Sequence, residues 1–161
     1  MTDSFTFHTA DNSIENNIFL QRLVLGFSLS VLAIPAGEDL IVIIRGGCAP
    51  HVGSVSVARS TAARNPPAET WGPSPGAADC PAETGSQTAG AGNLPVETIL
   101  LPGHRDDVIG ESFARELAGA AGKTVSVNCG IHYANPSRQE IGVIVQSAQS
   151  MLFELIQLLS R

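Results

Sequence analysis

Apolar and polar positions alternate through much of the first third of the chain. Every odd position from 23 to 33 is apolar, and a period of two is typical of a strand with one buried face. The turn-forming residues 35–39 separate this segment from the apolar run 40–44, which predicts a strand buried on both faces. We expect these two strands to form a hairpin. Residues 54–57 alternate again and predict a third short strand.

The last third of the chain predicts helices as well as strands. Residues 96–101 and 123–128 have strand character, whereas residues 106–121 and 137–160 carry apolar stripes at helical spacing. Gly122 stands where a left-handed residue would end the first helix, and Ser137 and Glu140 have the spacing of a capping box. This order is that of a β-α-β-α unit.

The predicted fold class is therefore α/β (α+β). We expect a mixed sheet with N-terminal antiparallel hairpin strands and a C-terminal β-α-β-α unit, with the helices packing on the sheet. Phe5 and Phe7 are candidates for a further, weak edge strand.

Residues 60–95 interrupt these patterns. The segment contains no Ile, Val, Phe or Met and holds six of the ten prolines of the chain, so it can sustain neither a core nor a helix. We expect a long, mobile Pro/Gly/Ala-rich loop, a tolerated insertion rather than a functional lid, within a single domain that spans residues 1–161. Trp71 is its one candidate for docking on the domain.

Composition and charge exclude several classes of partner. A chain of 161 residues with 43% hydrophobic residues has the size of one globular domain. The net charge is −6 and Lys123 is the only lysine, so we expect no nucleic-acid binding. The apolar stretch 23–34 is too short to span a bilayer and the first residues lack the layout of a signal peptide. We therefore expect a cytoplasmic protein that does not cross a membrane, with its three cysteines reduced.

Three of the four histidines follow predicted strands. His51 comes after residues 40–45, His104 after residues 96–101, and His132 after residues 123–128. Because the carboxyl ends of parallel strands share one edge of a sheet, the three imidazoles can meet there if the strand before His51 runs in the same direction as the other two. Three imidazoles suit a divalent metal ion with an open coordination position. The alternative is that each histidine caps a turn or packs beneath the loop.

Two of these histidines belong to a repeated spacing, Cys48-x-x-His51 and Cys129-x-x-His132. A Cys₂His₂ zinc site is one interpretation, although structural zinc sites usually include a CxxC arm and stabilise domains that lack a core. A thiolate nucleophile is another, although spacing alone does not establish a thiolate–imidazole pair. We favour neutral thiols near a histidine site.

A possible anion site lies where residues 102–107 join a strand to a helix. Free N–H groups at a helix N-terminus attract anions, and Arg105 is placed to bind a phosphate. Asp106 and Asp107 stand at the start of the helix, where capping is their simplest role. Glycine-containing turns allow close backbone approach to a ligand, but the chain has neither a GxGxxG motif nor a P-loop lysine.

These motifs, taken in order, resemble the LpdD-like prenylated-flavin chaperones, small proteins associated with UbiD-type decarboxylases. The segments that carry the resemblance are 46–55 (GGCAPHVGSV), 104–107 (HRDD) and 130–135 (GIHYAN). It extends over nearly the whole chain apart from residues 60–95. The resemblance implies an α/β sandwich related to proteasome-assembling chaperones, which binds reduced prenylated FMN (or FMN) with a divalent metal ion. It also implies a role in maturing that cofactor or delivering it to a UbiD-type decarboxylase.

The resemblance also suggests roles for individual residues. The metal ligands it implies are His51, His104, His132 and Asp107. The residues proposed to contact the flavin are Gly46, Gly47, Cys48, Pro50, Gly53, Arg105, Asp106, Tyr133 and Asn135.

We thus expect a cofactor-binding chaperone rather than an enzyme, with no catalytic residue. One alternative is a small metal-dependent enzyme in which the same histidines activate a water molecule. Another is a ligand-free assembly chaperone that uses the helix 137–160 as its interface. We further expect a homodimer, because the apolar positions of that helix, Val143 and Val145 included, exceed the width that one sheet face needs.

Overall fold

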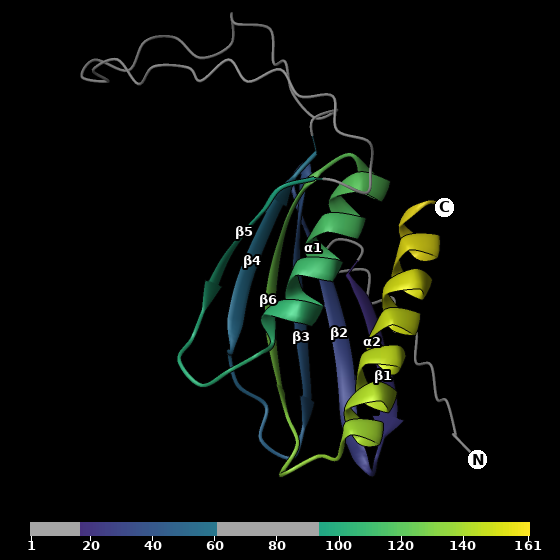
Figure 1. The fold of residues 1–161 in the computed structure, drawn as a ribbon. Helices are drawn as coiled ribbons and strands as arrows, with labels where there is room; N and C mark the ends of the chain where they lie inside the picture. The colour runs from purple at the N-terminus through teal and green to yellow at the C-terminus, as the bar shows by residue number, and fades with distance from the viewer. Residues whose placement is uncertain (1–16, 61–93) are drawn as a thin grey trace, which may run out of the picture.

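The computed structural model describes residues 17–60 and 94–161 (Figure 1). The elements are β1 (Ile18–Val24), β2 (Phe27–Ala36), β3 (Asp39–Gly47), β4 (Ser54–Arg59), β5 (Val96–Leu100), α1 (Asp107–Ala121), β6 (Thr124–His132) and α2 (Arg138–Leu159). The predictions made for Phe5, Phe7 and Trp71, and for most of the segment 60–95, lie outside the described residues.

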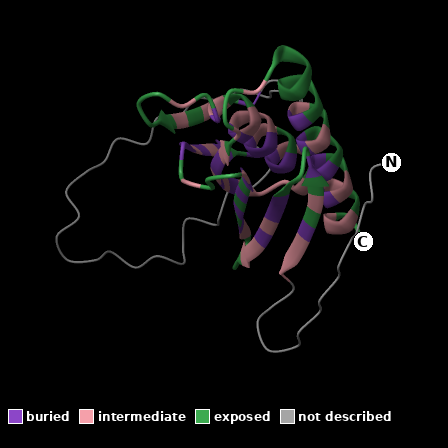
Figure 2. Ribbon diagram, turned by 90° about the horizontal axis from the view of Figure 1, so that it is seen from below, coloured by how far each residue is buried: buried purple, intermediate pink, exposed green. Residues whose placement is uncertain are grey.

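The six strands form one mixed sheet in the order β1-β2-β3-β6-β4-β5. Strands β1, β2 and β3 pair antiparallel, β6 pairs parallel with β3 and antiparallel with β4, and β4 pairs antiparallel with β5. Strands β3, β5 and β6 therefore all run in the same direction. Both helices lie on the same face of the sheet, which makes a two-layer structure (Figures 1 and 2). The predicted fold class is confirmed.

The first predicted strand, residues 23–33, is wrong as a single element. Leu25 and Gly26 have φ angles of 51° and 82° and form the two-residue turn of a hairpin between β1 and β2. A turn with positive φ at both central residues matches the twist of antiparallel strands. Because apolar residues continue to alternate through this turn, the period alone did not reveal it.

The prediction that residues 40–44 are buried on both faces is also wrong. Leu40, Val42 and Ile44 are buried, but Ile41 and Ile43 are each 37% exposed. The reason is that the helices cover only one face of the sheet. The predicted hairpin between β2 and β3 is confirmed, with its turn at Gly37 and Glu38.

In the predicted strand β4 the serines, rather than the valines, face the helices. Ser54 and Ser56 are fully buried, and Gly110 of α1 lies directly over them. A Cβ atom at Gly110 would be 3.0 Å from Ser54 Oγ and 3.1 Å from Ser56 Oγ. Small residues on both elements therefore allow α1 to pack close to the sheet.

The predicted helix boundaries agree with the structure. Gly122, with a φ of 66°, ends α1 and donates its N–H to the Ala118 carbonyl. The capping box of α2 is present: Glu140 N–H donates to Ser137 Oγ at 3.3 Å, and Ser137 N–H donates to Glu140 Oε2 at 2.8 Å. Strand β6 extends to His132, four residues beyond the predicted end at residue 128.

Helix α2 packs one stripe of its surface on β1 and α1. An ion pair of 2.9 Å between Arg22 and Glu154 ties it to β1. The stripe consists of Ile144, Ala148, Met151, Leu152 and Leu155. Within the described residues, α2 is also long and apolar enough, with a mean hydropathy of 1.3, to cross a membrane, a criterion that core helices of soluble proteins meet too. The expectation that the chain does not cross a membrane stays a prediction.

Candidate metal and flavin site

The carboxyl ends of β3, β5 and β6 meet at the lower edge of the sheet in Figure 1. The loop after β3 carries His51, and the loop between β5 and α1 carries His104 and Asp106. His132 is the last residue of β6. The histidines could meet only if the strand before His51 runs in the same direction as the other two strands. Strand β3 does run parallel to β6, so this condition is met.

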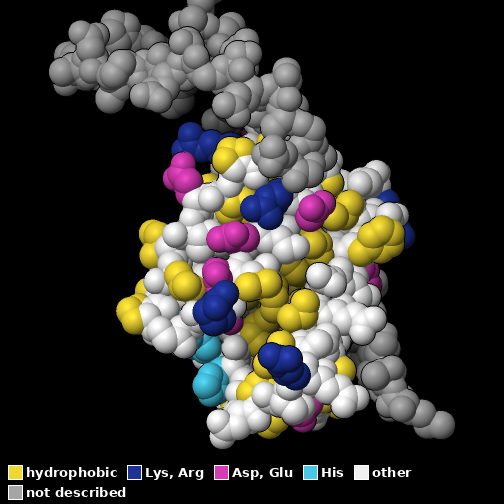
Figure 3. Space-filling view, viewed as in Figure 1, with side chains coloured by type: hydrophobic (Ala, Val, Ile, Leu, Met, Phe, Trp, Pro, Cys, Tyr) yellow, Lys and Arg dark blue, Asp and Glu magenta, His cyan; other side chains and the backbone are white. Residues whose placement is uncertain are grey.

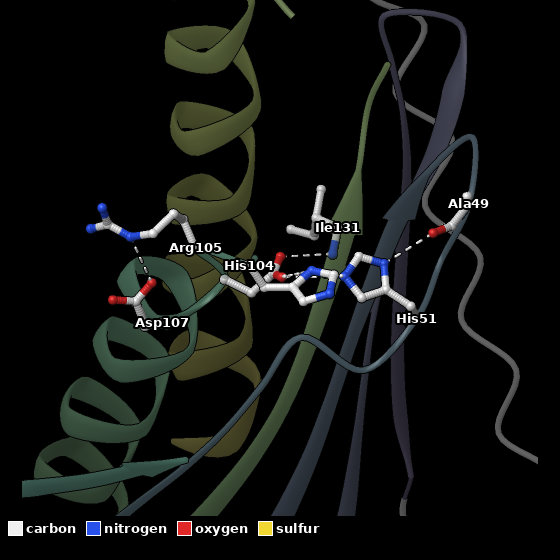
Figure 4. A network of polar contacts seen from close by, with 7 residues as sticks. Ala49, His51, His104, Arg105, Asp107 and Ile131 are labelled. Atoms are coloured by element: carbon white, nitrogen blue, oxygen red, sulfur yellow. Dashed lines mark hydrogen bonds and ion pairs between the residues drawn. The ribbon is translucent and has the colours of Figure 1, made fainter. Parts of the chain in front are cut away.

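The side chains of His51 and His104 contact each other directly (Figure 4). His51 Nε2 lies 2.8 Å from His104 Nδ1, and the ring centroids are 4.3 Å apart. His51 Nδ1 lies 3.1 Å from the carbonyl oxygen of Ala49, and this hydrogen bond assigns the proton to Nδ1. In the neutral form of His51 with its proton on Nδ1, the lone pair of Nε2 is directed toward His104.

Asp106 joins the two histidines. Its carboxylate is only 7% exposed, and Oδ1 accepts a hydrogen bond of 2.9 Å from the backbone N–H of Ile131. The other oxygen, Oδ2, lies 3.4 Å from His51 Nε2 and 3.7 Å from His104 Nδ1. The expectation that Asp106 caps α1 through its side chain is wrong, because the side chain makes no capping bond. Strand β6 thus donates a hydrogen bond to Oδ1 of Asp106, and His51 and His104 face Oδ2.

These three donor atoms fit a divalent metal ion. The three atoms lie within 4.8 Å of one another, and their separations resemble the edge of about 3.3 Å that follows from bonds of about 2.0–2.1 Å in a tetrahedral site. Two imidazoles and one carboxylate also form a common ligand set for catalytic zinc and non-haem iron. We call His51, His104 and Asp106 the His-His-Asp cluster.

Two further metal ligands implied by the resemblance lie beside the cluster rather than within it. The ring of His132 is exposed, and its centroid is 5.9 Å from that of His51. Asp107 Oδ1 lies 3.4 Å from Arg105 Nε, and this pair points away from the imidazoles (Figure 4). The structure thus brings Asp106, rather than Asp107, to the histidines. Sequence could not separate the two acids because both occupy the start of the helix.

Gly53 and Gly130 allow the loops of the cluster to approach one another. A Cβ atom at Gly53 would overlap Asp106 Oδ2, and one at Gly130 would overlap the backbone carbonyl of His51. Gly53 therefore accommodates the carboxylate of the cluster, whereas we expected it to contact the flavin. Gly130 was missed as a site residue, although a glycine inside a strand often marks such a close approach.

The other residues expected to contact the flavin fall into two groups. Gly46 packs against Leu29, Gly47 packs against the His132 carbonyl, and Tyr133 donates its hydroxyl to the Val24 carbonyl at 3.1 Å, so these three contact protein. Burial raises the pKa of Tyr133 above its usual value, and the nearby Cys48 adds to the shift. The second group is exposed near the cluster and consists of Cys48, Pro50, Arg105 and Asn135.

The two described thiols occupy opposite environments. Cys48 is exposed, and its Sγ lies 3.5 Å from the His132 carbonyl. Cys129 is buried, and its burial, followed by the charge of Asp106, raises the pKa of its thiol. Cys129 is therefore neutral at physiological pH. Among the described residues, neither cysteine belongs to the group of possible metal ligands.

The surface around the cluster combines polar and apolar features. Figure 3 shows histidine side chains emerging at the lower edge of the molecule, close to the beginning of α1. The same view shows a hollow between the two helices, floored by hydrophobic side chains. Val108 near the start of α1 and Ile141 near the start of α2 are exposed. A helix N-terminus, an apolar surface and a possible metal site thus lie on one side of the protein.

Comparison with family models gives a match to the prenylated flavin chaperone LpdD-like domain over residues 76–160, just over half of the chain. The chain belongs to this family. The match includes His104, Asp106 and His132, and it confirms the family suggested by the sequence motifs. His51 lies outside the matched residues, so its assignment depends on the motif at residues 46–55 and on the geometry of the cluster. No curated protein matches the chain.

Proposed function

We propose that this LpdD-like protein binds prenylated FMN together with a divalent metal ion held by the His-His-Asp cluster. The observation that carries the proposal is the convergence of three ligand atoms from two loops at the edge of the sheet. A structural role alone does not require two histidines and a nearly buried carboxylate to face one another. Membership of a prenylated flavin chaperone family supplies the class of cofactor.

The start of α1 is the proposed site for the flavin phosphate. The first N–H groups of a helix have no partner within the helix and carry a partial positive charge. Arg105 adds a full charge there, and its side chain is 81% exposed. On phosphate binding, Arg105 would exchange its exposed contact with Asp107 for a charge-assisted bond to the ligand.

The hollow between the helices is the proposed site for the ring system. Its hydrophobic floor suits the apolar faces of a prenylated isoalloxazine, which is largely shielded from water when it lies against such a surface. Cys48, Pro50 and Asn135 are exposed on the neighbouring loops and are candidates for polar contacts at its rim. His132 would contribute to this rim.

The cluster residues are oriented before any ligand arrives. The carbonyl of Ala49 orients His51 by accepting a hydrogen bond from Nδ1, and the backbone N–H of Ile131 donates to Asp106. Such outer contacts fix ring orientation and strengthen the ligands of a metal. A bound divalent ion would supply Lewis-acid attraction for an oxygen atom of the reduced cofactor.

Delivery to a UbiD-type decarboxylase in the cytoplasm completes the proposal. His51 and His104 are partly exposed at an open edge of the sheet, so a partner enzyme can approach a cofactor bound there without unfolding of the chaperone. A homodimeric state belongs to the same proposal. We expected a dimer contact from the apolar positions of α2, but most of them are buried against α1 and β1. The exposed large apolar side chains of α2 are Ile141, Val143 and Phe153.

The variants Asp106→Asn and Asp107→Asn test the site as a matched pair of neighbouring acids. We expect the purified wild-type chain to bind one zinc or ferrous ion per chain, measured by elemental analysis, and to bind prenylated FMN, measured by absorbance and fluorescence. Asp106→Asn should lose most of the metal and Asp107→Asn should retain it. Equal metal content in the two variants would refute the cluster as the metal site.

The same measurements separate the alternative functions. Metal without any flavin would favour the metal-dependent enzyme, and neither ligand would favour the assembly chaperone. Transfer of bound flavin to an apo decarboxylase of the UbiD type, monitored by recovery of its activity, tests delivery.

A further inference from the structure

The two edges of the sheet differ in how they are covered. Strand β1 forms one edge, and α2 packs beside it, with Glu154 paired to Arg22 at 2.9 Å. Strand β5 forms the other edge, and no strand of the described residues pairs with its outer side (Figure 1). Soluble proteins usually protect such an edge with charges, proline or a covering element, because its free backbone groups can pair with another chain. Within β5 there is no proline, and Glu97 is the only charged residue.

The register of β5 shows which of its backbone groups are free. Continued by one residue, it places Leu101 opposite Gly53, and Leu101 N–H donates to the Gly53 carbonyl at 2.9 Å. Hydrogen-bonded and non-hydrogen-bonded pairs alternate along antiparallel strands, so residues 97 and 99 bond to β4 as well. The remaining residues of β5 direct their N–H and C=O groups outward, and these are Val96, Thr98 and Leu100. Among the described residues, none pairs with these outward groups.

Apolar side chains flank the outward groups near the end of β5. Thr98 Oγ1 lies 3.1 Å from Ser56 Oγ, and Ser56 is buried beneath α1. Thr98 and Leu100 therefore face the helices, whereas Ile99 faces the other side of the sheet. Leu100 is 41% exposed and Ile99 is 67% exposed. A strand added here would cover apolar surface on both sides of the sheet.

Helix α1 borders the same edge. Arg115 Nε donates to the Leu94 carbonyl at 3.1 Å, which places that side of α1 next to the start of β5. Val108 and Glu111 share this side, because they precede Arg115 by two turns and by one turn. Strand β5 and α1 run in opposite directions (Figure 1). An added strand would therefore meet the charges of Glu111 and Arg115 at one end and the exposed Val108 at the other.

The apolar end of this edge leads directly to the His-His-Asp cluster. The loop after β5 carries His104 and Asp106, and His104 N–H donates to the Leu101 carbonyl at 3.2 Å. Gly53, which accepts from Leu101, also lies against the Asp106 carboxylate. A chain paired with β5 would thus end beside the proposed cofactor site.

The composition of the preceding segment argues against pairing within the chain. Residues 61–93 contain five prolines and no Val, Ile, Leu, Phe or Tyr, although β-branched and aromatic residues favour strands. Proline also lacks the N–H that an added strand needs. An apolar segment from a second protein suits the edge better.

We propose that β5 is the docking edge for the decarboxylase that receives the cofactor, and that an extended segment of this enzyme pairs with β5 as a seventh strand. Main-chain bonds to the outward groups supply affinity, and alternate side chains supply specificity. The segment carries apolar side chains beside Leu100 and Ile99 and polar ones beside Glu111. This inference rests on the proposed delivery function and names the surface that delivery uses.

Amide hydrogen exchange of the full chain, quenched and followed by NMR, tests the pairing directly. In the free chain the amides of Val96, Thr98 and Leu100 should exchange at least tenfold faster than those of Glu97 and Ile99. Addition of the apo UbiD-type decarboxylase should slow the three outward amides at least tenfold. The amides of β1 should not change.

A pair of edge prolines tests the contribution of one outward bond. Leu100→Pro removes an N–H that has no partner in the free chain, so the variant should fold, bind the apo decarboxylase at least tenfold more weakly and transfer flavin more slowly. The matched control is Leu23→Pro in β1, where Leu23 is 61% exposed. Its N–H also points outward, because Val24 and Phe27 form the bonded pair that closes the two-residue turn. This control should bind the decarboxylase within twofold of wild type.

Circular dichroism and flavin content of each variant separate the possible outcomes. If Leu100→Pro does not fold, Leu100→Lys and Leu23→Lys provide a second matched pair. A complex without protection of the outward amides, or unchanged transfer by Leu100→Pro, would overturn the docking edge.

Two results with the free chain would also overturn it. Protection before the decarboxylase is added would show that the chain itself covers β5, and protection that rises with its concentration would indicate a contact between copies. Protection by the decarboxylase of a chain that binds no flavin would refute the proposed function and retain the docking edge.

Discussion

The two Cys-x-x-His segments share a spacing but place their side chains in opposite environments. In the first, Cys48 is exposed and His51 points into the His-His-Asp cluster. In the second, Cys129 is buried in the core and His132 is exposed. Only the histidine of the first segment contacts His104.

The difference arises from secondary structure. Residues 129–132 belong to β6, and residues three apart in a strand point to opposite faces of the sheet. Residues 48–51 follow the end of β3, where the chain is free to turn back over the edge. A ligand spacing therefore has chemical meaning only once the backbone conformation is known, which explains why the Cys₂His₂ interpretation does not fit the described structure.

Gly130→Ala is expected to have the largest effect, because Gly130 lies where the two segments touch. Its new Cβ would overlap the His51 carbonyl, so the loop or β6 must shift. We expect a loss of about 3 kcal/mol in the free energy of unfolding, measured by urea denaturation. The matched control is Gly142→Ala in α2, which has open space around it and should gain about 0.5–1 kcal/mol from helix propensity. If Gly130→Ala and Gly142→Ala changed the free energy of unfolding equally, the loop that carries His51 would move away from β6 easily.

His51→Ala and His132→Ala compare the two histidines directly. His51 provides an atom of the cluster, so its removal should weaken zinc binding about 100-fold, or about 2.7 kcal/mol. His132→Ala should change zinc affinity less than tenfold and should act mainly on flavin binding. Calorimetric titration of zinc measures both. A larger loss of zinc affinity for His132→Ala would place this histidine in the metal site.

Cys129→Ala and Cys48→Ala compare the two cysteines. Removal of a fully buried sulfur leaves a small cavity, and we expect a loss of about 1.5 kcal/mol in stability. Cys48→Ala should change stability by less than about 0.5 kcal/mol, as is usual for exposed positions. Thermal unfolding measures this difference. Alkylation of the folded protein should also modify Cys48 much faster than Cys129, since burial raises the pKa of the latter thiol.

Ser137→Ala tests how much the capping box of α2, which follows the second Cys-x-x-His segment, contributes to the free energy of unfolding. The capping box of α2 begins five residues after His132, and loss of the Ser137 hydroxyl should cost about 1 kcal/mol.

The capping box should also make stability depend on pH. The backbone hydrogen bond and then the hydroxyl of Ser137 lower the pKa of Glu140, so its contribution is complete above its unfolded pKa and is lost as the pH falls through the folded value. Wild type should therefore lose in acid the part of its advantage over Ser137→Ala that comes from the bond between the Ser137 hydroxyl and the Glu140 carboxylate. The bond from Glu140 N–H to Ser137 Oγ does not titrate. An advantage that is constant from neutral to acidic pH would contradict this role for Glu140.

Much of the fold follows from local sequence. The strand and helix types in residues 40–57 and 96–160, the hairpin turn at Gly37, the end of α1 at Gly122 and the capping box of α2 were all predictable. These features depend on interactions between residues within about five positions of one another. The turn at Leu25 and Gly26 is the exception, because a leucine with positive φ gives no signal in a pattern of alternating apolar residues.

The sequence alone also determined the family and two of the three members of the His-His-Asp cluster, through motifs that follow predicted strands. Only the tertiary structure decided that Asp106 rather than Asp107 joins His51 and His104, that Gly130 must lack a side chain, and that both described helices lie on the same face of the sheet. The physical reason is sequence separation. Residues 51 and 104 are brought together by the order and direction of β3, β6, β4 and β5, and that order results from packing across the whole sheet rather than from the preferences of any short segment.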